Sequence, residues 1–134
     1  MEFRDTDAGG IVHFSVYFTL MEQAEHAFWR SLGRSVMTPD GEDAISWPRV
    51  AAKCDYSAPL RFEDEVEVEV AVRRRGGKSA TFAFTMTKDG SAVARGELTA
   101  VCCRIRHGAP PVSIPIPEDV AAELDRYLIV ESPS

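Results

Sequence analysis

Cysteine is scarce in this sequence, with three among 134 residues. Cys102 and Cys103 are adjacent, so on a strand their side chains would point to opposite faces and could not form an ordinary disulfide. The third, Cys54, stands alone and is expected in the core rather than as a nucleophile. This usage argues against a disulfide scaffold, predicts a reducing cytoplasmic location, and offers no spacing typical of a metal site.

Long apolar runs and excess positive charge are also lacking. No run approaches the ~20 residues of a membrane helix, and the first five residues lack the apolar segment of a signal peptide. Lys plus Arg number 15 against 21 Asp plus Glu, for a net charge of −6 and a pI near 5.0. This balance argues against nucleic acid and anionic membranes as partners.

The length favours a single domain over residues 1–134, since domains typically span ~100–200 residues. Hydrophobic residues make up 45% of the chain, which is ordinary for a globular protein. A chain of this size can bury roughly two-thirds of its unfolded surface. It therefore needs neither disulfides nor a metal to form a core.

One long helix is predicted over residues 15–32, with Gly33 as its stop. Apolar side chains recur there with a period near 3.6 and widen into more than one face, which indicates a helix covered by other elements. Four later segments alternate apolar and polar residues and are predicted strands: 50–56, 65–72, 79–87 and 92–106. The apolar register shifts near Cys102, which predicts a bulge there or burial on both faces.

The remaining segments are predicted as connections. Residues 37–43 contain Pro39, Asp40 and Gly41 and are expected to form a loop, 110–117 a linker, and a short helix should open at 117–119. One helix followed by antiparallel strands predicts an α+β domain whose sheet curls around the helix. Such a sheet leaves open edges that a second copy could cover, so a dimer is expected.

The most informative segment is residues 5–17, where Asp5 and Asp7 precede the glycine pair Gly9–Gly10 and the start of the long helix. Backbone N–H groups at a helix start are unpaired donors that can hold a developing oxyanion. A carboxylate facing such donors is a minimal acyl-transfer site. The same residues could instead cap and form an ordinary turn.

This segment closely resembles the opening motif of hotdog-fold acyl-CoA thioesterases of the 4-hydroxybenzoyl-CoA thioesterase type. Residues 18–29 resemble the central helix of that family, and residues 56–66, 73–79 and 116–118 also match it. The resemblance covers nearly the whole chain. It implies a hotdog fold, with an antiparallel sheet wrapped around one central helix.

The resemblance implies that Asp7 acts on the thioester carbonyl as nucleophile or general base, and that the backbone N–H of Phe14 polarises that carbonyl. Asp5 would be a structural turn residue. The site would form at the interface of a homodimer, or of a dimer of dimers. Coenzyme A would enter only as part of the substrate, with no further cofactor.

Other candidates remain open between two roles. Gly10, Tyr17 and Glu22 are candidate substrate contacts, although Tyr17 could pack in the core and Glu22 could be exposed. His13 could contact substrate or be a plain loop histidine. A basic cluster could bind the phosphates of coenzyme A, or could be a solvated hairpin end: Arg73, Arg74, Arg75 and Lys78.

Two departures from the family pattern stand out. Many relatives carry Tyr-His where this chain has His13–Phe14, and relatives usually place a strand before the Asp-x-Asp loop, whereas only residues 1–4 precede it here. We expect that strand to be very short, or the natural start to lie upstream. The acyl group could be small and aromatic or fatty. A carrier-protein thioesterase and a non-catalytic acyl-CoA-binding module are the alternatives.

Overall fold

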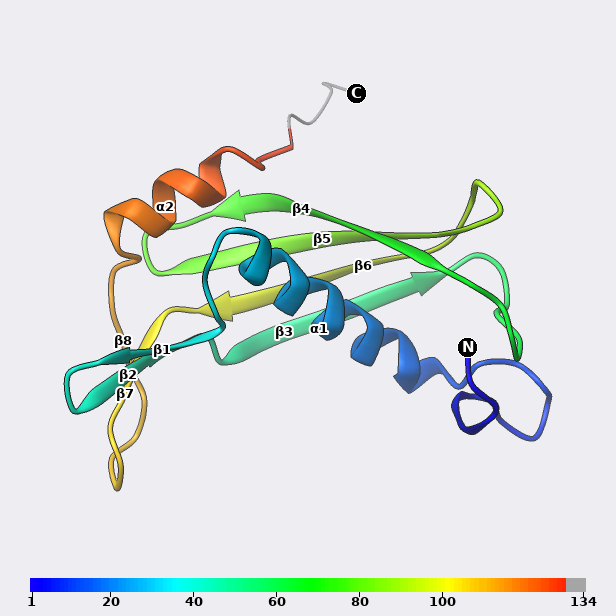
Figure 1. Cartoon of the computed structure of the whole chain (residues 1–134), viewed down its shortest axis with the longest axis horizontal. Coiled ribbons are helices and arrows are strands. Elements are labelled where there is room, and N and C mark those ends of the chain that lie inside the picture. Colours follow the sequence, from blue (N-terminus) through cyan, green and yellow to red (C-terminus); the bar gives the residue numbers. More distant parts are fainter. Residues whose placement is uncertain (130–134) are drawn as a thin grey trace.

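The computed structural model describes residues 1–129, so residues 130–134 of the predicted domain lie outside the described residues. Two helices and a 3-10 turn accompany eight strands (Figure 1). In chain order these are η1 (Phe3–Asp5), α1 (Phe14–Ser31), β1 (Met37–Asp40), β2 (Asp43–Ser46), β3 (Arg49–Tyr56), β4 (Glu67–Arg75), β5 (Ser79–Lys88), β6 (Ser91–Val101), β7 (Cys103–Ile105), β8 (Val112–Ser113) and α2 (Glu118–Asp125).

The main sheet is antiparallel with strand order β3-β6-β5-β4, and α1 lies across one of its faces (Figure 1). The buried residues of α1 are Tyr17, Met21, Glu25, Phe28 and Trp29. Their spacing places them on one side of the helix, against the buried side of β5, whose residues alternate between the two faces of the sheet. The Phe28 and Phe82 rings meet edge to face, with centroids 5.8 Å apart. The predicted α+β architecture is confirmed.

Gly96 of β6 allows α1 to approach the sheet. A Cβ atom at this position would lie 2.2 Å from the sulfur of Met21 and 3.0 Å from the backbone oxygen of Lys53. The sulfur is the far end of a flexible side chain, so a larger residue at position 96 would displace the Met21 side chain and crowd the backbone of β3. Gly96 therefore leaves room for Met21 between α1 and the sheet.

The prediction of a loop over residues 37–43 is wrong, because β1 and β2 form a hairpin there. Met37 pairs with Ser46 and Asp40 with Asp43 around a turn at Gly41. All four residues of β1 are exposed, so no apolar alternation marks the strand in the sequence. Backbone pairing with β2 and an ion pair between Asp40 and Arg104 hold it, and edge strands tolerate a proline such as Pro39.

The predicted strand 92–106 is divided at Cys102. β6 ends at Val101 in the main sheet, and β7 begins at Cys103 in a smaller sheet of order β1-β2-β7-β8. Cys102 and Cys103 are both buried, as the shift in apolar register predicts. β8 lies inside the predicted linker, where two exposed residues pair with β7, so that prediction is wrong in part.

Residues 3–5 form η1, where we expected either a very short strand or a natural start further upstream. The Asp5 N–H donates to the Glu2 carbonyl oxygen over 2.9 Å, and the Glu2 N–H donates to the Asp5 carboxylate, also over 2.9 Å. These local bonds close a tight turn. Asp5 is thus a turn residue, and Asp7 lies in the loop that follows η1.

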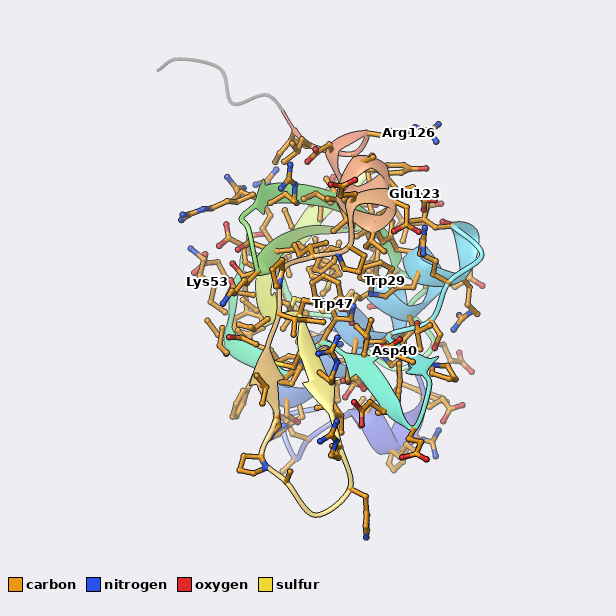
Figure 2. The ribbon with its side chains drawn as sticks, turned by 90° about the vertical axis from the view of Figure 1, so that its left-hand side faces the viewer. Trp29, Asp40, Trp47, Lys53, Glu123 and Arg126 are labelled. Carbon is orange, nitrogen blue, oxygen red and sulfur yellow. The ribbon has the colours of Figure 1, made fainter. Side chains whose placement is uncertain are left out.

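α2 covers the end of the sheet near β4. Arg34, just beyond α1, donates hydrogen bonds to Asp119 and Glu123 of α2 over 3.0–3.2 Å. Trp29 and Trp47 lie close together below this helix, with ring centroids 5.2 Å apart (Figure 2). Within residues 1–129, no helix is long and apolar enough to span a membrane.

Candidate active site

The loop over residues 6–12 is a narrow turn that presents Asp7. The Asp7 N–H donates to the Ile11 oxygen over 2.8 Å, and the Gly10 N–H donates to the Asp7 oxygen over 3.0 Å. Gly10 has a φ of 77°, in the left-handed region that glycine adopts most easily. The glycine pair therefore serves the path of the chain around Asp7.

The Asp7 carboxylate is fixed by one oxygen only. The Gly9 N–H donates to Asp7 Oδ1 over 2.8 Å. Asp7 Oδ2 accepts no hydrogen bond from the residues that the structure describes. One oxygen therefore sets the direction of the group, and the other is available to a substrate or a water molecule.

The start of α1 lies directly beyond this loop. Phe14 is the first residue of the helix, a position where the backbone N–H has no partner within the helix. The Val12 N–H donates to the Leu60 oxygen over 2.7 Å and the His13 N–H donates to the Asp5 oxygen over 2.8 Å. These bonds fix the helix start to both the Asp5 turn and the segment after β3.

One cavity joins the carboxylate to the helix start. It has a volume of about 460 Å³. Its lining consists of Asp7, Ile11, Val12, Phe14, Tyr17, Tyr56, Ser57, Ala58 and Pro59. The structure thus brings together three predicted site residues, namely Asp7, Phe14 and Tyr17.

Sequence reasoning missed the other wall of this cavity. The sequence assigns residues 56–59 to a strand and loop that match the family, and it predicts no role for them at the site. Tyr56 ends β3 and its ring stands edge-on to that of Tyr17, with centroids 4.7 Å apart and planes at 76°. An aromatic residue followed by small residues and proline at a strand end was the available signal.

The phenols and the thiol beside the cavity stay protonated near neutral pH. Burial raises the pKa of Tyr17 and of Tyr56, so both hydroxyls remain hydrogen-bond donors. Burial also raises the pKa of Cys54, which is half-buried on β3. A thiol of raised pKa is a poor nucleophile. Among the residues that line the cavity, Asp7 carries the carboxylate, and its predicted role in catalysis stays a prediction.

Three further candidates lie outside the cavity lining, namely Gly10, His13 and Glu22. His13 precedes α1 and caps it, with Nδ1 accepting from the Ser15 N–H over 3.3 Å. Glu22 is exposed, with an oxygen 4.0 Å from the Arg49 guanidinium. Their predicted roles in catalysis and substrate contact stay predictions.

The predicted coenzyme A cluster lies at the other end of β4 from the Asp7 loop (Figure 1). Arg73 forms an ion pair with Glu97 over 2.6 Å, and Arg75 donates two hydrogen bonds to Asp125 over 2.7 and 2.8 Å. Arg74 and Lys78 are exposed. Their role in binding phosphate stays a prediction. Within residues 1–129, no three His, Cys, Asp or Glu side chains are grouped to hold a metal ion.

Comparisons with known proteins identify the family of this chain. Residues 1–124 match the family described as the Thioesterase-like superfamily. A protein of Aquifex aeolicus is 34% identical over 117 residues, which are 86% of this chain and 87% of that protein. The 1,4-dihydroxy-2-naphthoyl-CoA hydrolase of Synechococcus elongatus is 27% identical over 105 residues, 76% of each chain.

Solved structures place the fold in the same family. The gentisyl-coenzyme A thioesterase BH1999 superposes with a TM-score of 0.76 at 32% identity, covering 90% of this chain and 94% of its own. The 1,4-dihydroxy-2-naphthoyl-CoA thioesterase of Synechocystis, at 19% identity, superposes with a TM-score of 0.79 over 93% of this chain and 90% of its own, and supports the fold alone. The fold is the predicted hotdog fold. The chain belongs to the thioesterase-like superfamily and is a thioester hydrolase.

Proposed function

We propose that this protein hydrolyses small aromatic or fatty acyl-CoA thioesters to the free acid and coenzyme A, with Asp7 acting on the thioester carbonyl. The observation that carries the proposal is the single cavity lined by both Asp7 and Phe14 at the first turn of α1. A carboxylate and an unpaired helix-start N–H on one cavity are the two groups that acyl transfer to water requires.

In this reaction the Phe14 N–H stabilises the negative charge that develops on the carbonyl oxygen. Asp7 Oδ2 either takes a proton from the attacking water or attacks the carbonyl carbon itself. The C–S bond then breaks, and the thiolate of coenzyme A leaves and takes up a proton. In the second route water hydrolyses the mixed anhydride and restores Asp7.

The acyl group would lie against the aromatic wall of the cavity. Phe14, Tyr17 and Tyr56 line a cavity of about 460 Å³ and give the acyl group an aromatic surface to pack on. Two relatives are named for aromatic acyl-CoA substrates, the gentisyl and dihydroxynaphthoyl thioesters. This favours an aromatic acyl group. A carrier-protein thioester presents the same acyl end and is the second substrate to assay.

The active protein would be a homodimer formed through β3, alone or within a dimer of dimers. β3 is an edge of the main sheet, and within residues 1–129 no strand pairs with its outer side. By contrast, the opposite edge is partly covered, since the Val72 N–H donates to the Tyr127 oxygen over 3.0 Å. Val50 on β3 is 63% exposed. Unpaired edges of this kind invite pairing with a second strand.

The test is thiol release from a panel of acyl-CoA and acyl-carrier thioesters by the purified protein and its Asp7→Asn variant. We expect the variant to lose ~10²-fold or more in kcat, because it removes the acting carboxylate. Asp5→Asn is the matched control, since Asp5 has a structural role in the neighbouring turn. Wild-type protein that binds an acyl-CoA, seen as a rise in Tm, without releasing thiol would contradict hydrolysis and support a non-catalytic binding module.

A further inference from the structure

The peptide group between Phe14 and Ser15 is held at both ends by side chains. The Tyr56 hydroxyl donates to the Phe14 carbonyl oxygen over 3.3 Å. On the other side of the same peptide, the Ser15 N–H donates to His13 Nδ1, also over 3.3 Å. One side chain reaches this peptide from the end of β3 and the other from the residue that caps α1.

Tyr56 is 45% exposed and packs against one buried aromatic ring. Its ring stands edge-on to the ring of Tyr17, which is buried on α1 one turn beyond Phe14. Such aromatic pairs stabilise a defined orientation beyond the apolar area they bury. The phenol stays protonated near neutral pH because burial raises its pKa, so it can donate to the carbonyl throughout that range.

His13 completes the arrangement from the opposite side. Its Nδ1 lies 2.8 Å from Ser15 Oγ as well as accepting from the Ser15 N–H, so this nitrogen acts as an acceptor. The imidazole also packs on the Phe14 ring, with centroids 4.5 Å apart. A capping side chain that accepts from the first turn fixes the local backbone.

We propose that Tyr56 is a positioning residue of the active site, acting together with His13 on the Phe14–Ser15 peptide. This inference rests on the proposed function, in which the Phe14 N–H binds the oxyanion. That N–H belongs to the preceding peptide, and its direction relative to the cavity depends on the dihedral angles of Phe14. Fixing the next peptide plane restricts those angles and keeps the N–H aimed at the carbonyl oxygen.

The expected effect of losing the Tyr56 hydroxyl is smaller than that of losing an oxyanion donor. Removing such a donor lowers kcat by ~10²–10³-fold. A donor that stays present but less well aimed should lower kcat by about 10-fold, because small misplacements of catalytic groups cost up to ~10²-fold. Substrate binding should change little, since the ring of Tyr56 remains.

The experiment compares wild type with Tyr56→Phe in steady-state thiol release from an acyl-CoA that the wild type hydrolyses. We expect kcat to fall by about 10-fold with KM within about 2-fold of wild type. Tyr127→Phe is the matched control, because Tyr127 packs on Phe28 near α2, away from the cavity. Tm values for all variants separate loss of positioning from loss of the fold.

A second pair of variants tests the other end of the peptide. His13→Ala removes the acceptor and should lower kcat in the same way, whereas His13→Asn keeps a capping oxygen and should restore most of the rate. A Tyr56→Phe variant with unchanged kcat, or with only KM raised, would overturn the positioning role. An unchanged Tyr56→Phe variant leaves the proposed function intact as long as wild type is active and Asp7→Asn is inactive. Wild type that releases no thiol would overturn both.

Discussion

The carboxylate of Glu25 is hydrogen-bonded to the guanidinium of Arg49 between α1 and the start of β3. Glu25 is fully buried, and its second oxygen accepts from Trp29 Nε1 over 3.4 Å. Arg49 also donates to the Trp47 oxygen over 2.7 Å. Burial raises the pKa of Glu25, and the partners on its two oxygens oppose that shift by stabilising the charged form, which is what burial of a carboxylate requires.

Replacing Arg49 by Met should therefore destabilise the protein strongly. The change leaves the Glu25 carboxylate buried without its cation, and breaking a buried pair on one side costs about 3–5 kcal/mol. We expect the lower end of this range, since a quarter of the Arg49 side chain is exposed. Urea unfolding of wild type and variant measures the difference in free energy of unfolding.

Arg104→Met is the control for that measurement. Arg104 forms an ion pair with Asp40 over 3.6 Å in which both side chains are 47% exposed. Surface pairs of this kind contribute less than about 1 kcal/mol. A loss at Arg49 no larger than the loss at Arg104 would contradict the structural role of the buried pair.

The ion pairs of α2 should make stability depend on pH in the acid range. Hydrogen bonds from Arg34 hold the pKa of Asp119 below its ordinary value, and those from Arg75 do the same for Asp125. An acid whose pKa is lowered on folding contributes stability above its unfolded pKa of about 3.9. That stability is lost as the pH falls through the lower pKa of the folded state.

Thermal unfolding between pH 6 and pH 2 checks this prediction. Wild type should lose Tm below about pH 4, and Arg75→Met should lose less over the same interval, because one of the pairs is already absent. A difference in Tm between the two proteins that stays constant from pH 6 to pH 2 would contradict the assignment.

Gly9 lies against the Asp7 carboxylate, so a larger residue at position 9 should disturb the candidate active site. A Cβ atom there would lie 3.2 Å from Asp7 Oδ1, the oxygen that the Gly9 N–H holds. Gly9→Ala should displace the carboxylate by a few tenths of an ångström. We expect kcat to fall about 5- to 10-fold, since small misplacements of a catalytic group are costly.

The control is Gly77→Ala, at an exposed position where an added Cβ meets nothing within 4 Å. Its thiol-release rate should match wild type. Both variants should keep the wild-type Tm to within a few degrees, which separates an effect on Asp7 from an effect on the fold. Equal kcat for Gly9→Ala and wild type would show that the position of the carboxylate tolerates this crowding.

The elements that sequence could predict are those with one buried face. α1 and β5 carry apolar residues at their own periods because each packs against the other layer. β1 and β8 have no buried residue, so no apolar pattern marks them in the sequence. A strand without a buried face can be recognised only when the strand it pairs with is known.

The same distinction applies to the site. Asp7 and the start of α1 are close in the chain, so a local motif contains both of them. Tyr56 reaches Phe14 across 42 positions, and Arg49 reaches Glu25 across 24. Such pairs arise from the packing of β3 against α1, and the chemistry of each residue alone does not identify its partner.

The exposed edge of β3 predicts how assembly and activity are linked. Ala51 and Ala52 are exposed on this strand, so replacing both by Lys should cost a single chain little, whereas like charges at a strand-to-strand contact disfavour pairing. Wild type should sediment at two or four times the chain mass of 14.8 kDa, and the double Lys variant at half the wild-type mass with lower activity. Analytical ultracentrifugation beside the thiol-release assay measures both. A double variant that keeps the wild-type mass and full activity would exclude this edge as the subunit contact.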